Sequence, residues 1–155
     1  MADTDEIASE LRKHGSVCLS VRGKSMLPTI WPSDWIRIET VDVSSLTEGD
    51  VVLFRSQDRC FVHRVQQVVI GETGERTFLT QGDAMPEADP HISGEQILGR
   101  VAGGMSSERK FELERRRSIW NRSAGTVLAN VGPISSLASR LIDEKLAWKK
   151  KRKIL

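Results

Sequence analysis

The sequence has few cysteines, no tyrosine and no long apolar run, and these shortages exclude several classes of protein. Its two cysteines, Cys18 and Cys60, are too few for a disulfide framework or a four-ligand zinc site built from cysteine alone. No stretch approaches the roughly 20 apolar residues of a membrane-spanning helix. The first 13 residues contain four acids and no apolar core typical of a secretory signal. We therefore expect a cytoplasmic protein, with both thiols reduced, that is neither integral to a membrane nor exported.

The sequence does have enough apolar residues for one folded core. The 155 residues are 39% hydrophobic and 28% charged, which fits one domain and excludes disorder throughout. A net charge of +2 hides an uneven distribution. Residues 1–108 carry 10 basic and 17 acidic side chains, whereas residues 109–155 carry 13 and 4. An acidic body followed by a basic segment indicates two parts with different partners.

Periodicity divides the chain into three predicted parts. Residues 1–16 form a helical lead-in, with a helix from Ile7 to His14 that Gly15 ends. Residues 17–108 form a mainly β domain, a barrel or sandwich of short strands separated by turn residues. The predicted strands are 17–21, 35–39, 51–54, 60–65, 67–70, 77–80 and 97–101, and 110–114 is a candidate for one more.

Residues 109–155 form a basic C-terminal extension that we predict to be partly helical. Apolar residues recur at helical spacing from Ile134 to Lys151, which indicates an amphipathic helix. This helix could pack against the β domain, or it could contact an anionic membrane through the basic run 149–153. Nucleic acid is not the partner we expect, because the tail lacks the interleaved aromatic residues that favour single-strand binding. The sequence does not determine the oligomeric state.

Three sites in the β domain carry groups that could act together in catalysis. Ser25 lies between Gly23 and Pro28, which could hold its hydroxyl on a sharply turned loop. His63 lies in a strand, on the face opposite Val62, and an imidazole suits a general base at neutral pH. A loop from 80 to 89 supplies carboxylates, one of which could orient the imidazole. Each signal is weak alone, because serines in turns, histidines in strands and acids in loops are common.

Five short blocks in one order resemble the signal peptidase I-like and LexA-like serine peptidase superfamily (S24/S26 type). The blocks are Gly23-Lys24-Ser25-Met26-Leu27-Pro28-Thr29-Ile30, Glu48-Gly49-Asp50-Val51-Val52-Leu53-Phe54, Val62-His63-Arg64-Val65, Leu79-Thr80-Gln81-Gly82-Asp83 and Ile97-Leu98-Gly99-Arg100-Val101. The resemblance implies a mainly β peptidase fold, a polypeptide substrate, and neither metal nor organic cofactor.

The histidine before Arg64 is similar to the branch of the superfamily that uses a Ser-His pair, found in the endoplasmic reticulum and in archaea. In that branch the resemblance implies Ser25 as nucleophile and His63 as general base. An aspartate six residues after Asp83 completes the site there, so the orienting role goes to Asp89. Asp83 then becomes a supporting residue that fixes the loop.

The chain departs from the family pattern at several positions. Ser33 stands where the family usually has glycine, Gln81 stands where it has lysine, and Gly23 provides no hydroxyl for an oxyanion hole. We also expect no N-terminal membrane anchor, since the 24 residues before Ser25 are polar. Two alternatives to a serine endopeptidase remain: a self-cleaving regulator of the LexA type, and a non-catalytic membrane-binding or nucleic-acid-binding module on the same fold.

We predict that the basic run 149–153 supports salt-dependent binding to anionic vesicles. Each Lys or Arg near such a surface contributes about 1 kcal/mol, and salt screens this attraction. Co-sedimentation with vesicles of anionic and of neutral lipid, each at low and high salt, measures the effect. Replacing the five basic residues with glutamine should release the protein, and equal binding by this variant would contradict the prediction.

Overall fold

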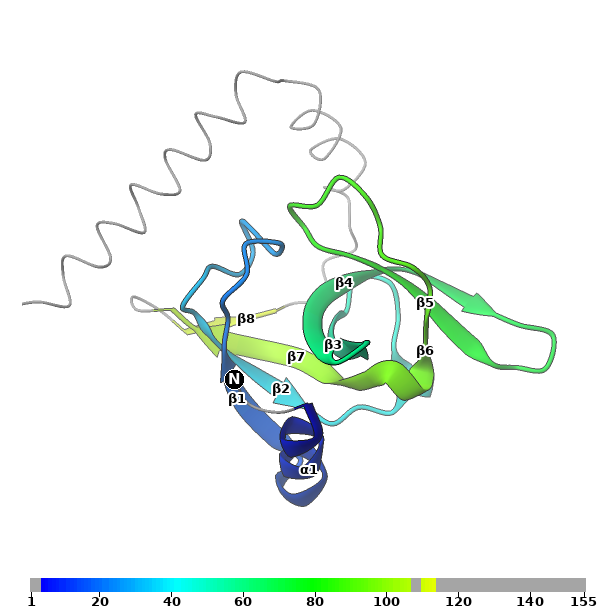
Figure 1. Cartoon of the computed structure of the whole chain (residues 1–155), viewed down its shortest axis with the longest axis horizontal. Helices are drawn as coiled ribbons and strands as arrows, with labels where there is room; N and C mark the ends of the chain where they lie inside the picture. Colours follow the sequence, from blue (N-terminus) through cyan, green and yellow to red (C-terminus); the bar gives the residue numbers. More distant parts are fainter. Residues whose placement is uncertain (1–3, 107–109, 114–155) are drawn as a thin grey trace, which may run out of the picture. The chain divides into compact units, whose positions relative to one another are not determined.

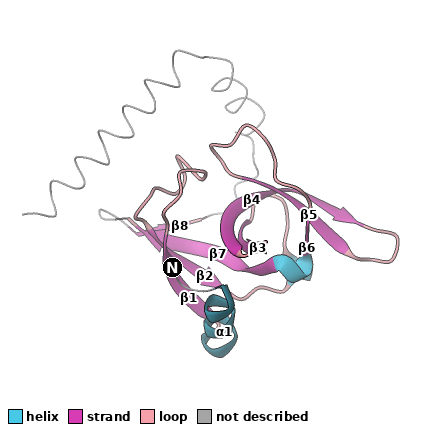
Figure 2. Cartoon of the chain, viewed as in Figure 1, coloured by secondary structure: helices cyan, strands magenta, loops and turns pink. Residues whose placement is uncertain are grey.

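The computed structural model describes residues 4–106 and 110–113, which form one α-helix and an eight-stranded antiparallel sheet (Figure 1). The elements in chain order are α1 (Thr4–His14), β1 (Ser16–Ser20), β2 (Trp35–Glu39), η1 (Val43–Ser45), β3 (Val51–Ser56), β4 (Arg59–Ile70), β5 (Arg76–Gln81), β6 (Ile92–Ser93), η2 (Gly94–Gln96), β7 (Ile97–Met105) and β8 (Lys110–Glu112). The sheet order is β1-β2-β7-β3-β4-β5-β6, and β8 pairs with β7. Strands and loops make up most of the described residues (Figure 2). The prediction of a mainly β fold with a short N-terminal helix is confirmed.

Helix α1 begins at Thr4, earlier than predicted, and ends at His14 as expected. Ile7 and Leu11 lie one turn apart on the same face and are both buried, which explains why this short helix docks on the sheet. Gly15 has a φ of +71°, and its N–H donates to the carbonyl of Leu11 at 2.9 Å. A left-handed glycine of this kind ends a helix without the steric cost that other residues meet.

The strands differ from the predicted ones chiefly around β4. Residues 60–65 and 67–70 were predicted as two strands, but they form one long strand with a register shift between Val65 and Gln67. A bulge of this kind keeps a strand paired while bending it, so the break in the apolar pattern does not end the strand. The short elements β6, η1 and η2 were not predicted at all. The candidate strand at 110–114 forms over its first three residues, as β8; Leu113 lies beyond the strand, and residue 114 lies outside the described residues.

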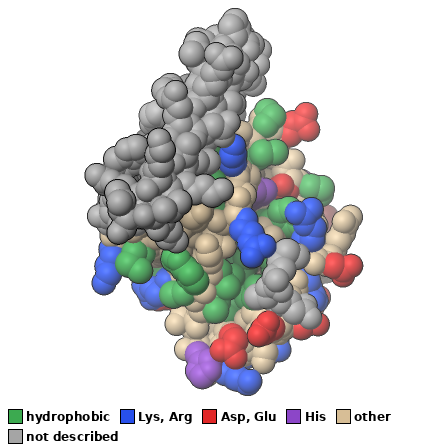
Figure 3. All heavy atoms as spheres, turned by 60° about the vertical axis from the view of Figure 1, so that its left-hand side comes forward, with side chains coloured by type: hydrophobic (Ala, Val, Ile, Leu, Met, Phe, Trp, Pro, Cys, Tyr) green, Lys and Arg blue, Asp and Glu red, His purple; other side chains and the backbone are tan. Residues whose placement is uncertain are grey.

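Charged side chains of both signs are interspersed on the visible face of the described part (Figure 3). Hydrophobic side chains also reach this surface among them. No helix within residues 4–106 and 110–113 has the length and apolar character needed to cross a bilayer.

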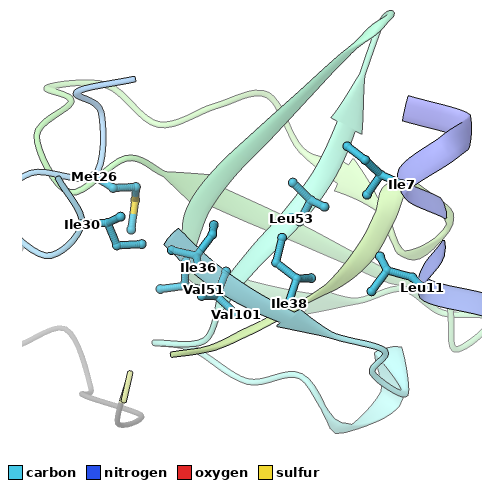
Figure 4. Close-up of a cluster of buried hydrophobic side chains, with 9 residues drawn as sticks. All are labelled: Ile7, Leu11, Met26, Ile30, Ile36, Ile38, Val51, Leu53 and Val101. Carbon is cyan, nitrogen blue, oxygen red and sulfur yellow. The ribbon is translucent and has the colours of Figure 1, made fainter. Parts of the chain in front are cut away.

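Two apolar clusters pack against the sheet, and β3 contributes to both. Val51 and Leu53 belong to the cluster drawn in Figure 4, whereas Val52 and Phe54 belong to the second cluster. Successive side chains of a strand point to opposite faces, so the continuous apolar run 51–54 places β3 between two buried layers. This central strand carries the neighbouring strand β4, which pairs with it from Val51↔Arg64 to Ser56↔Arg59.

The predicted C-terminal helix at 134–151 and the basic run 149–153 lie outside the described residues. Their membrane contact therefore stays a prediction, as do the cytoplasmic location and the division of the chain at residues 16 and 108.

We predict that Ser33→Gly stabilises the protein. Ser33 has a φ of +73°, a left-handed conformation that costs a residue with a Cβ about 1–2 kcal/mol. Glycine removes this strain but loses more backbone entropy on folding, so the expected net gain is about 0.5–1 kcal/mol. Urea denaturation measures it, and Ser44→Gly is the control at a position without a positive φ. A Ser33→Gly protein no more stable than the wild type would contradict the prediction.

Candidate active site

Ser25 lies in the 21–34 loop between β1 and β2, and backbone hydrogen bonds close the base of this loop. The N–H of Val21 donates to the carbonyl of Asp34 at 2.8 Å, and the N–H of Ser33 donates to the carbonyl of Val21 at 2.7 Å. Three buried side chains that follow Ser25 anchor the loop in the interior: Met26, Leu27 and Ile30. The loop is therefore a fixed part of the fold, and it holds the hydroxyl of Ser25 in one place.

His63 lies on β4, opposite Val52 of β3, and only 6% of the residue is exposed. Its Nε2 atom is 3.0 Å from Oγ of Ser25, across 38 positions of sequence. The rings of Phe54 and Phe61 lie about 6 Å from the imidazole, at centroid distances of 5.9 and 6.1 Å. Sheet pairing and these rings hold the imidazole in place.

Asp89 lies on the 82–91 loop between β5 and β6 and contacts the other side of the imidazole. Its Oδ2 atom is 2.6 Å from Nδ1 of His63. A carboxylate accepts hydrogen bonds, so this pairing requires a proton on Nδ1. In a neutral imidazole Nε2 is then left as an acceptor, and it faces the hydroxyl of Ser25. The arrangement can take the proton from Ser25 and stabilise the resulting imidazolium.

Asp83, the other predicted site residue, does not contact His63 in any hydrogen bond of the structure's described part. Its carboxylate forms a bidentate pair with Arg64, at 2.8 Å to Nε and 2.7 Å to Nη2. It also accepts a hydrogen bond from Oγ1 of Thr29 at 2.5 Å. Both side chains of the ion pair are more than nine-tenths buried. Removing one partner of such a buried pair destabilises the fold by about 3–5 kcal/mol. The contacts of Asp83 therefore indicate a structural role.

Two hydrogen-bonded chains therefore run side by side through the same three segments. One joins Ser25, His63 and Asp89. The second joins Thr29, Arg64 and Asp83, and it continues from Nη1 of Arg64 to the carbonyl of Gly49 at 2.9 Å. The first chain runs from the 21–34 loop through β4 to the 82–91 loop. In the second chain Asp83 of the 82–91 loop is the middle member, because it accepts from Thr29 of the 21–34 loop and from Arg64 of β4. The partnerships of Thr29 and Arg64 were not predicted, although both residues stand in the matching blocks.

Gly82 is a further residue whose importance was not predicted. A Cβ atom at this position would lie 2.7 Å from the backbone oxygen of Ser25 and 2.9 Å from its Cβ. Real side chains do not tolerate such distances, so only glycine allows the 82–91 loop to approach Ser25 so closely. The next contact fixes that approach, because the N–H of Ala84 donates to the carbonyl of Ser25 at 2.8 Å.

Gln81, which departs from the family pattern, also holds this loop. Its Nε2 atom donates to the carbonyl of Met85 at 2.7 Å, and the N–H of Met85 donates to the carbonyl of Gly82 at 2.9 Å. Met85 is 44% exposed. A Cβ atom on Gly82 would lie 2.8 Å from Cγ of Met85 and 2.9 Å from Cβ of Ser25, so the side chains of Met85 and Ser25 flank the same glycine. An apolar side chain therefore reaches solvent close to Ser25.

Within the part of the chain that the structure describes, no group of three or more His, Cys, Asp or Glu side chains is placed to hold a metal ion. The chemistry that these residues can perform is proton transfer and nucleophilic attack by a hydroxyl.

Comparison with known proteins agrees with this chemistry at the level of the family. The model described as Peptidase S24-like matches residues 3–102, and no curated protein matches the chain. The matched region contains Ser25, His63, Asp83 and Asp89, together with most of the sheet. Since the match covers well over half of the chain, the protein belongs to the Peptidase S24-like family, within the LexA and signal peptidase superfamily.

Proposed function

We propose that the protein is a serine endopeptidase of the signal-peptidase-like type, related to the branch that uses a Ser-His pair. The observation that supports this proposal is the continuous chain from Oγ of Ser25 through the imidazole of His63 to Oδ2 of Asp89, with contacts of 3.0 and 2.6 Å. A serine hydroxyl is a poor nucleophile unless a base lies within hydrogen-bonding reach. Here the base is in reach, and a third group orients it.

In the proposed mechanism Ser25 attacks the carbonyl carbon of the scissile peptide bond while His63 takes the hydroxyl proton. Asp89 holds the imidazole in the required tautomer and stabilises the imidazolium. The same imidazolium gives the proton to the leaving amine, and the acyl group stays on Ser25. Water then attacks this ester with His63 again as the base, which restores the hydroxyl and releases the carboxylic acid.

We assign the backbone N–H of Ser25 as a donor to the oxyanion that forms in the first step. Gly23 has no side chain, and a Cβ there would lie 4.0 Å from Oγ of Ser25, so residue 23 offers no hydroxyl to this oxyanion. Hydrogen bonds to a developing oxyanion contribute about 2.7–4 kcal/mol each, and a fixed loop keeps such a donor in place before the reaction.

The sheet topology favours a substrate that binds as an extended segment. β1 is at one end of the strand order, and it leads directly into the loop that carries Ser25. An added strand gains affinity from its backbone, while its side chains determine selectivity. Exposed Met85 beside Ser25 would then contact a side chain near the scissile bond.

LexA-type proteins cut themselves at an Ala-Gly bond, and Ala102–Gly103 is the bond of this kind within the described residues. Its position inside the sheet disfavours self-cleavage there. Gly103 of β7 pairs with Arg37 of β2 on one side and with Glu112 of β8 on the other. Presenting this bond to Ser25 would require the local loss of both pairings. The sequence Ala124-Gly125 lies outside the described residues, so intact mass after alkaline incubation tests self-cleavage at any position.

The wild-type protein should react with a fluorophosphonate at Ser25. In this reaction the bond from Oγ to phosphorus forms, the P–F bond breaks and fluoride leaves. Ser25→Ala removes the nucleophile and His63→Ala removes the base, so each variant should lose labelling by about a thousandfold or more. Intact mass followed by peptide mapping measures both the rate and the modified residue. Labelling should also decrease at low pH, because a protonated imidazole cannot accept the hydroxyl proton.

The matched control is Ser20→Ala, which removes an exposed hydroxyl from the end of β1 and should label at the wild-type rate. Circular dichroism spectra of all variants establish that the sheet is intact. Wild-type protein that is folded but not labelled at Ser25 would argue against the peptidase proposal, and so would a His63→Ala variant that labels normally.

The two aspartates should respond differently to the same substitution. Asp89→Asn should slow labelling by about a thousandfold, since the amide favours the wrong tautomer of the imidazole. Its stability should fall less than that of the Asp83 variant, because the Asp89 side chain is 26% exposed whereas that of Asp83 is 8% exposed, and an amide oxygen at residue 89 can still accept hydrogen bonds. Asp83→Asn leaves Arg64 buried without its anionic partner and should cost about 3 kcal/mol. Urea denaturation and the labelling rate, measured on both variants, check this contrast; equal stability losses would contradict it.

A further inference from the structure

Thr80 of β5 places a hydroxyl in the interior, at a position that the strand pattern reserves for apolar side chains. β5 alternates so that Phe78 and Thr80 are both fully buried. Thr80 lies opposite Val65, which is also fully buried. A hydroxyl buried without a partner costs free energy, and valine has the same shape and a high strand propensity. A threonine here therefore needs a reason that packing does not supply.

The hydroxyl of Thr80 is bound to the carboxylate next to His63. Oγ1 of Thr80 donates to Oδ2 of Asp89 at 2.8 Å. The direction of the bond follows from the acceptor, because a carboxylate has no proton to give. Oδ2 is also the atom that lies 2.6 Å from Nδ1 of His63. One carboxylate oxygen thus accepts from two donors, and these two bonds determine how the carboxylate is turned.

The backbone strengthens this link, since the N–H of Asp89 donates to the carbonyl of Thr80 at 2.8 Å. The two residues are joined by one backbone bond and one side-chain bond. Removal of the hydroxyl leaves the backbone bond in place, so Asp89 stays beside His63 but its carboxylate loses one of its two restraints.

We propose that Thr80 is a positioning residue for the reaction, which fixes Oδ2 of Asp89 toward His63 and shares the charge of that oxygen. This inference rests on the proposed function, in which His63 is the general base. Thr80 touches no reacting atom and acts through Asp89. A charge-assisted hydrogen bond is about twice as strong as a neutral one, so this single hydroxyl has a measurable effect on the carboxylate.

Asp89 is the charged group that contacts the imidazole of His63 directly. On β3 and β4 the neighbouring rings are those of Phe54 and Phe61, which carry no charge. Ser25 from the 21–34 loop contacts Nε2 and is neutral. Arg64, which follows His63 on β4, forms a buried ion pair with Asp83, and these two charges offset each other. Lys24, which precedes Ser25 on the 21–34 loop, is exposed to solvent, where its charge is screened.

Thr80→Val tests the proposal, with the second-order rate of fluorophosphonate labelling at Ser25 measured across pH. The plateau rate should fall about tenfold, the effect of losing one charge-assisted hydrogen bond. The low-pH limb of the profile of labelling rate against pH should move to higher pH by about half a pH unit. A carboxylate with one donor fewer concentrates its charge on the imidazole and favours the protonated ring. A residue that only fills space would leave this limb in place.

Two further variants separate the hydroxyl from the packing. Thr80→Ser keeps the hydroxyl and loses a methyl group, so its low-pH limb should match the wild type. Thr77→Val makes the same change three residues away on β5, at a half-buried position, and should leave both rate and limb unchanged. Thermal denaturation of each variant establishes that it is folded at the assay temperature.

The outcomes distinguish this inference from the proposed function. Absence of labelling at Ser25 in the wild type overturns the peptidase proposal and the inference with it. Labelling of the wild type overturns the inference alone if the Thr80→Val limb coincides with the wild-type limb or moves to lower pH. A Thr80→Ser variant that behaves like Thr80→Val also overturns it, because the effect would then come from lost packing.

Discussion

The geometry of the site depends on two adjacent side chains of β4, His63 and Arg64. His63 bonds to Ser25 of the 21–34 loop and to Asp89 of the 82–91 loop. Arg64 bonds to Asp83 of the 82–91 loop, and the same carboxylate accepts a hydrogen bond from Thr29 of the 21–34 loop. Because both chains connect the same pair of loops, neither loop can move away from one chain without straining the other. The ion pair of Arg64 has a particular role in this arrangement. It is buried, so leaving either charge alone costs far more than the pair itself contributes. The ion pair thereby helps to keep both loops at the positions from which Ser25 and Asp89 contact His63.

Local sequence patterns predicted most of the fold, and the errors have local causes. The strand at 35–39 was predicted with its correct ends, since its alternating residues face one buried layer. The run 59–70 was divided because a bulge shifts the alternation after Val65, and periodicity cannot distinguish a bulge from a turn. β6 was missed because a two-residue strand leaves no period to detect. Its pairing with β5 arises from tertiary contacts.

The part of the site that could be predicted from the sequence is the part that lies in short motifs. The resemblance to the family implied Ser25, His63 and Asp89 as site residues. The structure places Ser25 in contact with His63, and His63 in contact with Asp89. The partners of Thr29 and Thr80 were not predictable, because no sequence rule connects a hydroxyl to a carboxylate across a loop. Thr29 bonds across 54 positions. Thr80 is separated by nine positions from its acceptor, but only the fold of the 82–91 loop brings the two together.

Two glycine positions of the family pattern, residues 33 and 82, favour glycine for different physical reasons. At residue 33 this chain carries serine with a φ of +73°, and the fold accepts about 1–2 kcal/mol of backbone strain. At residue 82 the constraint is contact, since any Cβ would collide with the backbone oxygen and the Cβ of Ser25. Strain at the base of a loop lowers stability without moving Ser25, whereas a collision at Gly82 has to displace it. A departure at residue 33 therefore leaves the contact between Ser25 and His63 in place, and one at residue 82 does not.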